Sequence, residues 1–184
     1  MPGSSHPSSK AEVLHAARKA RAAIRERVLA LSPDDCARPF LGTWSVKDLV
    51  AHLIGWDETN VRAVRSLLRG QLPAFYAQHD NDWQTYNARL VRKYGGHPIG
   101  TLMRMERQSH SKLLEALEAV PPDKFGADVG VRFRGFKVTI ERLISAEADD
   151  ERVHARQIAQ AFGTGRRRAG ATTNPKTHAM RRLP

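Results

Sequence analysis

Two histidines and a carboxylate stand out in the sequence because of where helices would place them. His52 follows Leu49 by three residues and precedes Trp56 by four, so it lies on the apolar stripe of its segment. Asp150 and His154 are four residues apart, which puts them one turn apart on one helix face. Two imidazoles and one carboxylate that converge inside a bundle form a donor set that suits zinc, nickel or ferrous iron.

Three protein ligands would leave coordination positions open for water or substrate, as in reactive zinc sites. A metal held in this way lowers the pKa of a bound thiol or water and supplies a nucleophile at neutral pH. The spacing also fits a simpler alternative, in which His52 is a satisfied core histidine and Asp150 and His154 form an ion pair near the surface. The residues alone leave both interpretations open and assign no catalytic residue.

The last predicted helix carries acidic residues on its core-facing stripe, which runs through Glu147, Asp150 or Glu151, and His154. A buried carboxylate is costly without a counter-charge or a metal. We therefore expect Asp150 to face inward as a metal ligand. Glu147 is a candidate for a further ligand or for a group that accepts an imidazole N–H and orients it, and a solvated surface charge is its alternative role.

Other chemistries find less support. His110, with Glu106 one turn earlier, is a candidate supporting group or general base, although a satisfied or solvent-facing histidine fits as well. Cys36 is the single cysteine, which excludes an internal disulfide framework, and it has no histidine near it in sequence. No phosphate-binding glycine loop, zinc-finger spacing or G-x-S-x-G elbow occurs, which argues against most nucleotide-dependent and serine-hydrolase functions.

Helical periodicity dominates the segments that must position these residues. The first helix is capped by Ser9 and the second by Ser45, which forms a capping box with Asp48. Gly-rich residues 123–137 predict an extended connection with a short strand pair. The fold class is therefore all-α, a four-helix bundle with a long crossover and one short extra helix. The predicted helices span about residues 10–31, 46–69, 81–94, 99–119 and 138–162.

The chain has 184 residues, 41% of them hydrophobic, which is enough for one domain, and we place it at residues 10–163. Residues 1–9 are predicted to be a flexible N-terminus and 164–184 a disordered basic tail. The net charge of +11 initially favours a nucleic-acid partner. However, residues 35–163 contribute only +2 and the tail +6, so nucleic-acid binding through the tail is an open but less favoured alternative.

Within the domain, one basic stripe is formed by Arg62, Arg65 and Arg69, and such a stripe is usually the solvated face of a helix. The sequence has no run of about 18 apolar residues and its N-terminus lacks the apolar core of a signal peptide. We therefore expect a soluble, cytoplasmic protein with no membrane partner.

The segments TWSVKDLVAHLIGWDE and DDERVHARQI resemble the DinB-like, YfiT-type superfamily of helical-bundle metalloproteins. The resemblance implies a four-helix bundle with a long crossover. It also implies a divalent metal held by one histidine of the second helix and an H-x-x-x-H pair of the last. By position, His52 matches the first ligand and His154 the final one. Asp150 departs from the common histidine but resembles the glutamate that the mycothiol-dependent isomerase branch places there.

The segment NDWQTYNARLVRKYGGHPIGTLMRMERQSHSKLLEAL also resembles the ClbS/DfsB branch, which is implicated in self-protection against a DNA-alkylating metabolite and need not keep the metal ligands. Two functions follow from the resemblance. The first is a metal-dependent enzyme, with zinc or nickel ahead of iron, that transfers a low-molecular-weight thiol, isomerises or hydrolyses a small molecule, or detoxifies an electrophile. The second is a non-catalytic protein that sequesters a genotoxic metabolite or contacts DNA. A homodimer is expected in either case.

Overall fold

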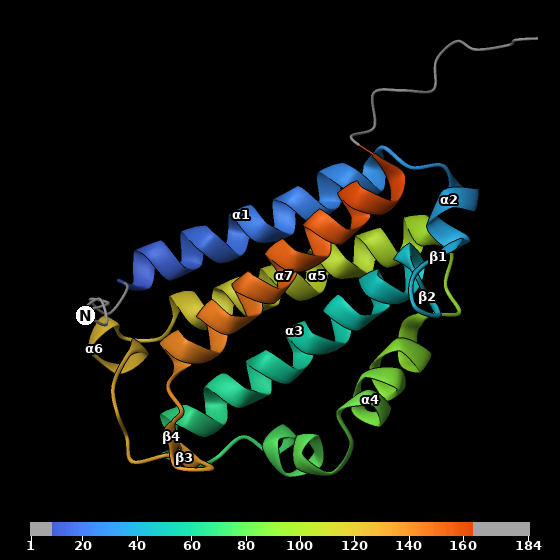
Figure 1. The fold of residues 1–184 in the computed structure, drawn as a ribbon. Coiled ribbons are helices and arrows are strands. Elements are labelled where there is room, and N and C mark those ends of the chain that lie inside the picture. The colour runs from blue at the N-terminus through green and yellow to red at the C-terminus, as the bar shows by residue number, and fades with distance from the viewer. Residues whose placement is uncertain (1–8, 164–184) are drawn as a thin grey trace, which may run out of the picture.

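The computed structural model describes residues 9–163, so the predicted basic tail and all but Ser9 of the predicted flexible N-terminus lie outside the described residues. Four long helices form the bundle in Figure 1, which confirms the predicted fold class. They are α1 (Lys10–Leu29), α3 (Val46–Leu68), α5 (Ile99–Glu118) and α7 (Ile140–Phe162).

The first and last helices of the bundle are neighbours. α1 packs along α7, and α3 packs along α5, while α4 (Phe75–Tyr94) covers another side of α3 (Figure 1). α3 is the most buried helix because it contacts α4, α5 and α7, and its inward side chains include Leu49, Leu53 and Trp56. Any side chain in the middle of α3 is therefore held by helices on several sides.

The predicted helix starts are confirmed by their caps. The Ser45 side chain accepts a hydrogen bond from the backbone N–H of Asp48, and the Asp48 carboxylate accepts one from the backbone N–H of Ser45 at 2.9 Å. Ser9 and Glu12 form the same reciprocal pair at the start of α1. α3 ends before Gly70, whose φ of 68° lies in the left-handed region that glycine occupies without strain.

The crossover helix α4 begins earlier than predicted because it consists of two parts. Asp82 has non-helical backbone angles (φ −167°, ψ 88°) and interrupts the helix. Its carboxylate accepts a hydrogen bond from the backbone N–H of Thr85 at 2.9 Å, as an N-terminal cap does. The predicted helix at 81–94 corresponds to the second part, and the first part was missed.

Short elements lie at the two ends of the bundle. At one end, α2 (Pro33–Ala37) and the hairpin of β1 (Pro39–Leu41) and β2 (Trp44–Ser45) precede α3; neither was predicted. At the other end, α6 (Pro122–Phe125) and the hairpin of β3 (Arg132–Phe133) and β4 (Phe136–Lys137) lead into α7, as predicted for a strand pair in this segment. None of the described helices has the length and apolar character needed to cross a lipid bilayer.

Candidate metal centre

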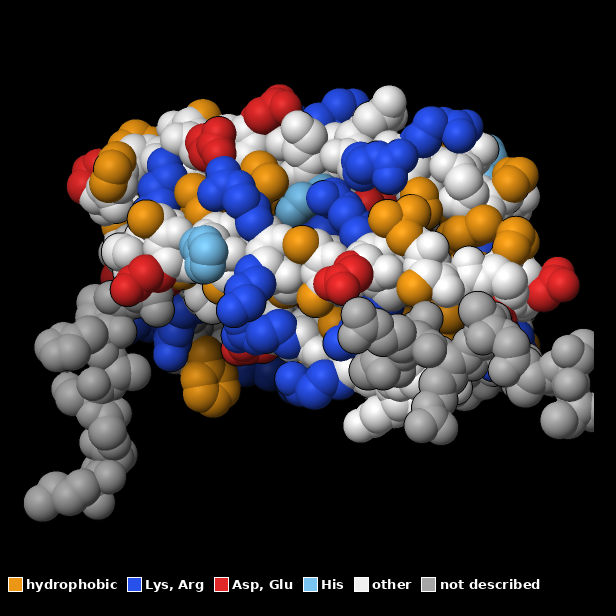
Figure 2. All heavy atoms as spheres, turned by 90° about the horizontal axis from the view of Figure 1, so that it is seen from above, with side chains coloured by type: hydrophobic (Ala, Val, Ile, Leu, Met, Phe, Trp, Pro, Cys, Tyr) orange, Lys and Arg blue, Asp and Glu red, His pale blue; other side chains and the backbone are white. Residues whose placement is uncertain are grey.

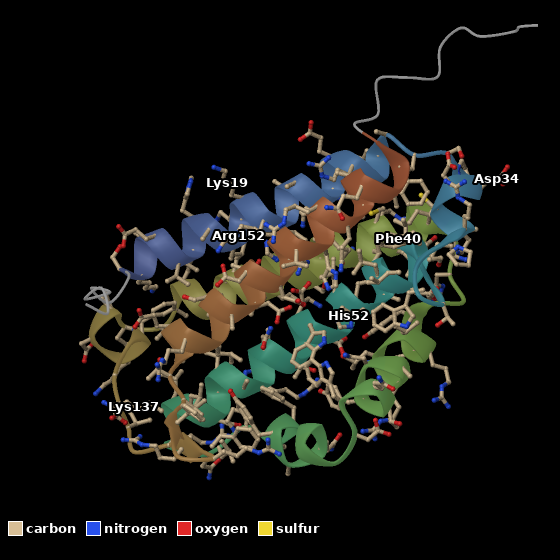
Figure 3. The ribbon with its side chains drawn as sticks, in the orientation of Figure 1. Lys19, Asp34, Phe40, His52, Lys137 and Arg152 are labelled. Atoms are coloured by element: carbon tan, nitrogen blue, oxygen red, sulfur yellow. The ribbon has the colours of Figure 1, made fainter. Side chains whose placement is uncertain are left out.

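The three residues singled out by the sequence come together in the structure. His52 on α3 and Asp150 and His154 on α7 each present one ligand atom, and these atoms all lie within 4.8 Å of one another. Figure 3 shows His52 in the N-terminal half of α3, where its side chain is buried. The facing positions of α3 and α7 thus produce the convergence that the helical spacing predicted.

His52 is held as a neutral imidazole in an aromatic setting. Its ring lies 5.0 Å from the ring of Trp44, which β2 places over it, and 6.2 Å from the ring of Trp56. Burial, with the positive charges of His154 and Arg21, lowers the pKa of His52 to about 3. Its Nδ1 atom is buried and has no hydrogen-bond partner among the described residues. A core histidine with satisfied nitrogens, the simpler alternative for this residue, would have a partner there.

His154 is held between two neighbours on its own helix. Its Nε2 lies 3.2 Å from Oδ2 of Asp150, and its Nδ1 lies 2.8 Å from the side-chain oxygen of Gln157. Burial opposes protonation of His154, but the hydrogen bond and charge of Asp150, helped by Gln157, outweigh burial and raise its pKa. Gln157 was missed in the sequence, although its position three residues after a candidate ligand was visible.

The prediction that Asp150 faces the core is wrong. Its side chain is 58% exposed, whereas that of Glu151 is 4% exposed. The buried residues of α7 include Ala148, Glu151 and His154, so of the two acids that the predicted stripe left open, Glu151 is the one that faces the core. Asp150 therefore lies on the solvent-exposed side of the candidate metal centre, and Glu151, the buried acid of α7, has a different partner.

That partner is Arg21 on α1, which is fully buried and donates all five of its N–H groups. Its guanidinium makes two bonds of 2.9 Å to Asp57, two of 2.6 and 3.0 Å to Glu151, and one of 3.0 Å to Glu106. Glu106 also accepts bonds from Arg25, the shortest at 2.8 Å. We call Arg21, Asp57, Glu106 and Glu151 the buried ionic cluster. Within it, Arg21 supplies the positive counter-charge that the buried carboxylates require.

Sequence reasoning missed this cluster, although a signal was present. Arg21 lies four residues after Ala17 and three before Ile24, so it interrupts the apolar stripe of α1. Glu106 interrupts the stripe of α5 between Met103 and Leu113 in the same way. When a basic residue interrupts the apolar stripe of one helix and an acidic residue interrupts that of another, the two are expected to form a buried ion pair.

The two supporting candidates lie at the buried ionic cluster. Nδ1 of His110 is 3.8 Å from Oδ1 of Asp57, and Ser109 donates a 2.6 Å hydrogen bond to the same carboxylate. Glu147 is partly buried, and burial together with Glu151, Asp57 and Asp150 raises its pKa to about 8 although Arg21 opposes the rise. Glu147 is therefore affected both by Asp150 of the candidate metal centre and by the carboxylates of the buried ionic cluster. Because its pKa is raised, its carboxyl holds a proton at neutral pH.

The residues present fit a divalent cation. The imidazole of His52 is neutral. In His154, Nδ1 is bound to Gln157, so Nε2 points to Asp150. The carboxylate of Asp150 is exposed to solvent. Two nitrogens and one oxygen within 4.8 Å can share one ion, and the open side at Asp150 leaves room for further ligands. Two clefts, of 560 and 510 Å³, lie elsewhere along α3, and none of the three residues lines them.

Comparison with known proteins places the fold. Residues 17–159 match the family described as mycothiol maleylpyruvate isomerase N-terminal domain. The colibactin self-resistance protein ClbS, solved in complex with double-stranded DNA, is similar with a TM-score of 0.69 and 21% identity, over 84% of this chain and 96% of that one. An uncharacterised protein from Escherichia coli UTI89 gives a TM-score of 0.68 and 20% identity, over 85% and 94% of the two chains. No curated protein matches the chain in sequence.

Proposed function

The chain belongs to the mycothiol maleylpyruvate isomerase N-terminal domain family, a DinB-like family, and on this premise we propose that it is a divalent-metal-dependent enzyme acting on a small electrophile. A low-molecular-weight thiol is the proposed co-substrate, and thiol transfer or isomerisation is the proposed reaction class. The observation that carries the proposal is the convergence of the ligand atoms of His52, Asp150 and His154 within 4.8 Å.

The three candidate ligands would have different roles because their surroundings differ. The neutral imidazole of His52 offers a nitrogen lone pair throughout the physiological pH range because its pKa lies near 3. Gln157 fixes the ring of His154, and the exposed carboxylate of Asp150 completes the set at the surface. A bound divalent cation supplies Lewis acidity, which lowers the pKa of a thiol or water that it contacts. Zinc or nickel is proposed ahead of iron for two imidazoles and one carboxylate.

Metal content tests the site directly. Protein purified without an affinity tag should contain about one equivalent of divalent metal, and His52→Ala and His154→Ala should lose most of it. His15, an exposed histidine of α1, provides the matched control, and His15→Ala should keep its metal. Asp150→Asn should weaken binding while Asp149→Asn, at the exposed neighbouring position, should not. Equal metal in all variants would remove the proposed centre.

Thiol-dependent activity tests the reaction class separately. The metal-loaded protein should accelerate conjugation of mycothiol or glutathione with 1-chloro-2,4-dinitrobenzene, in which the thiolate sulfur displaces chloride. The rate should fall in the metal-free protein and in His52→Ala. A metal-loaded protein with no acceleration over the uncatalysed reaction would contradict this assignment while leaving the metal site in place.

A second candidate function is non-catalytic protection or binding, and the similarity to ClbS favours it. In this function the bundle would sequester a genotoxic metabolite or contact DNA, with the basic residues 164–184 as an electrostatic arm. Salt-sensitive binding of the full chain to duplex DNA, lost on deletion of residues 164–184, would support it. No binding at low salt would exclude the DNA-contact form.

We further propose that the protein acts in the cytoplasm as a homodimer. The free thiol of Cys36 is buried, so the chain has no described group that needs an oxidising compartment. Light scattering coupled to size-exclusion chromatography should give twice the monomer mass of 20.6 kDa, and a single monomeric peak across the concentration range would contradict the dimer.

A further inference from the structure

A cleft of 560 Å³ lies between α3 and α4, and it is distinct from the candidate metal centre. Its cationic lining comes from both helices. The lining includes Arg62 and Arg65 of α3, Arg69 at the C-cap of that helix, and Arg89 and Lys93 of α4. The α3 arginines are the stripe that the sequence suggested to be a solvated helix face. The three arginines are exposed, as that interpretation requires, and they also lie along a concave surface together with two further cations.

The described residues do not balance the positive charge that lines this α3–α4 cleft. Among the side chains that the structure describes, Glu58 is the single carboxylate in its lining, and this group already lies 2.7 Å from Nζ of Lys93 and 4.0 Å from Nη1 of Arg62. Arg65, Arg69 and Arg89 form no ion pair within 4.0 Å of any residue that the structure describes, although the charge of Arg89 helps to lower the pKa of Asp82. Arg69 and Arg89 donate hydrogen bonds to Gln71 and to Gln78. Arg62 and Arg65 also line the second cleft, of 510 Å³, together with Lys112.

The inner wall of the α3–α4 cleft has a different character. Ala63 and Phe75 contribute apolar surface there and are themselves buried. Thr59 and Tyr86 add hydroxyl groups, which lie 2.9 Å apart, and the guanidinium of Arg89 lies 5.6 Å from the centre of the Tyr86 ring. The cleft thus combines an apolar and aromatic wall with a cationic rim.

Two other charged regions of residues 9–163 lack this combination. On the face formed by α1 and α7, Lys and Arg side chains are spread among acidic and apolar ones (Figure 2). Arg18 and Arg152 on this face are paired with Glu118 and Asp149. In the buried ionic cluster, every carboxylate has an arginine partner. Among the described residues, arginines without an acidic partner therefore converge on a concave surface at the α3–α4 cleft.

We propose that the α3–α4 cleft binds a small organic anion with an aromatic or apolar body and two or more anionic groups. Its volume falls in the range of small-molecule sites, about 300–1,000 Å³. An anion would relieve the mutual repulsion of the rim cations and accept charge-assisted hydrogen bonds from the arginine forks, while its body packs against Phe75 and Tyr86. This site goes beyond the proposed metal chemistry and does not depend on it.

Binding of naphthalene-1,5-disulfonate to the full chain, measured by calorimetry at low ionic strength after treatment with a chelator, tests the proposal. The probe should bind, and neutral 1,5-dihydroxynaphthalene should bind about tenfold more weakly or worse. Arg65→Ala/Arg69→Ala should weaken binding of the disulfonate by about tenfold or more. Arg92→Ala/Arg107→Ala removes the same charge at exposed positions outside both clefts and should leave binding unchanged.

Further variants and a second probe separate this site from the metal centre, from a general charge effect and from a polyanion surface. Disulfonate binding that persists in His52→Ala/His154→Ala would confirm independence from the metal centre, and its loss there would overturn the proposal. Equal weakening by the two arginine double variants would show a general charge effect and would also overturn it. The proposal fails as well if a short DNA duplex binds in an Arg65- and Arg69-dependent manner while the disulfonate does not bind, because the arginines would then serve a polyanion surface.

Discussion

Nδ1 of His154 lies 2.8 Å from the side-chain oxygen of Gln157, three residues further along α7. An amide oxygen only accepts hydrogen bonds, so the imidazole donates its Nδ1–H to this partner. Nε2 is then the nitrogen that points toward Asp150, 3.2 Å away, and toward the shared centre with His52. The tautomer and orientation of one candidate ligand are thus set by a residue outside the ligand set.

Replacing Gln157 should therefore weaken metal binding without removing a ligand. We expect Gln157→Leu to lower the affinity for zinc by about 10–100-fold, the range found when partners of metal-bound histidines are lost. Gln157→Glu keeps an acceptor and should retain more of the affinity. Gln160→Leu changes an exposed glutamine one turn further along α7 and serves as the control. Competition with a chromogenic zinc chelator measures all four proteins, and wild-type affinity in Gln157→Leu would contradict the role given to Gln157.

Removing the charge of Arg21 should strongly destabilise the fold. Arg21→Met leaves Asp57 and Glu151 buried without their counter-charge, and we expect a loss of about 3–5 kcal/mol in the free energy of unfolding. Arg18→Met, which breaks a solvent-exposed pair with Glu118 on the same helix, should cost about 0–1 kcal/mol. Urea denaturation monitored by circular dichroism gives both values. Similar losses in the two variants would mean that the buried carboxylates are neutralised in another way.

The sequence predicted what depends on local rules. The Ser45–Asp48 capping box and the inward position of His52 follow from spacing within one helix, and the structure confirms both. The sequence analysis chose Asp150 rather than Glu151 as the buried acid, and this was wrong. Adjacent residues on a helix differ by only about 100° in direction, so the facing helix decides which one is buried. Here Glu151 is buried because it pairs with Arg21, which lies 130 residues earlier in the chain.

The first hairpin and the start of α4 were missed for a related reason. β1 and β2 are too short to show an alternating pattern, and the position of Trp44 against His52 is a tertiary contact. The interruption of α4 at Asp82 concealed the helical turns before it, because a capping residue in the middle of a segment predicts a helix start there. Local patterns therefore located the residues of the candidate metal centre but not the neighbours that orient them.

Glu147 should make stability depend on pH. Its pKa is raised from 4.5 to about 8 by burial and by Glu151, Asp57 and Asp150, against the opposing effect of Arg21. Because the folded state binds this proton more tightly than the unfolded state, the stability that it contributes is fully present below pH 4.5 and is lost as the pH rises through 8.

Glu147→Gln should remove this dependence. In chelator-treated protein, the variant should gain about 1–3 kcal/mol over the wild type between pH 5 and pH 8. Glu26→Gln, at an exposed position of α1, should show a nearly constant difference from the wild type. Urea titrations at several pH values provide the measurement. A Glu147→Gln advantage that shrinks as the pH rises would reverse the sign and contradict protonation of Glu147 in the folded protein.

Gly55 should limit how closely α3 and α4 can pack. A Cβ atom at Gly55 would lie 2.7 Å from Cβ of Leu90, and a Cβ cannot swing away as the end of a flexible side chain can. Gly55→Ala should therefore displace α4 and cost about 1–3 kcal/mol, even though alanine favours a helix. Gly100→Ala, where a Cβ meets nothing within 4 Å, should instead be neutral or stabilise by up to about 1 kcal/mol.

The pair with Leu90 provides the decisive comparison. If the contact is the cause, Gly55→Ala/Leu90→Gly, in which the opposing Cβ is removed, should be more stable than the sum of the single changes predicts, by about 0.5–3 kcal/mol. Thermal and urea unfolding of the two single variants and the double variant complete the cycle. Additive losses would show that the cost of Gly55→Ala arises elsewhere. Because Leu90 also lines the α3–α4 cleft, a coupled loss would link the helix spacing to the shape of the proposed anion site.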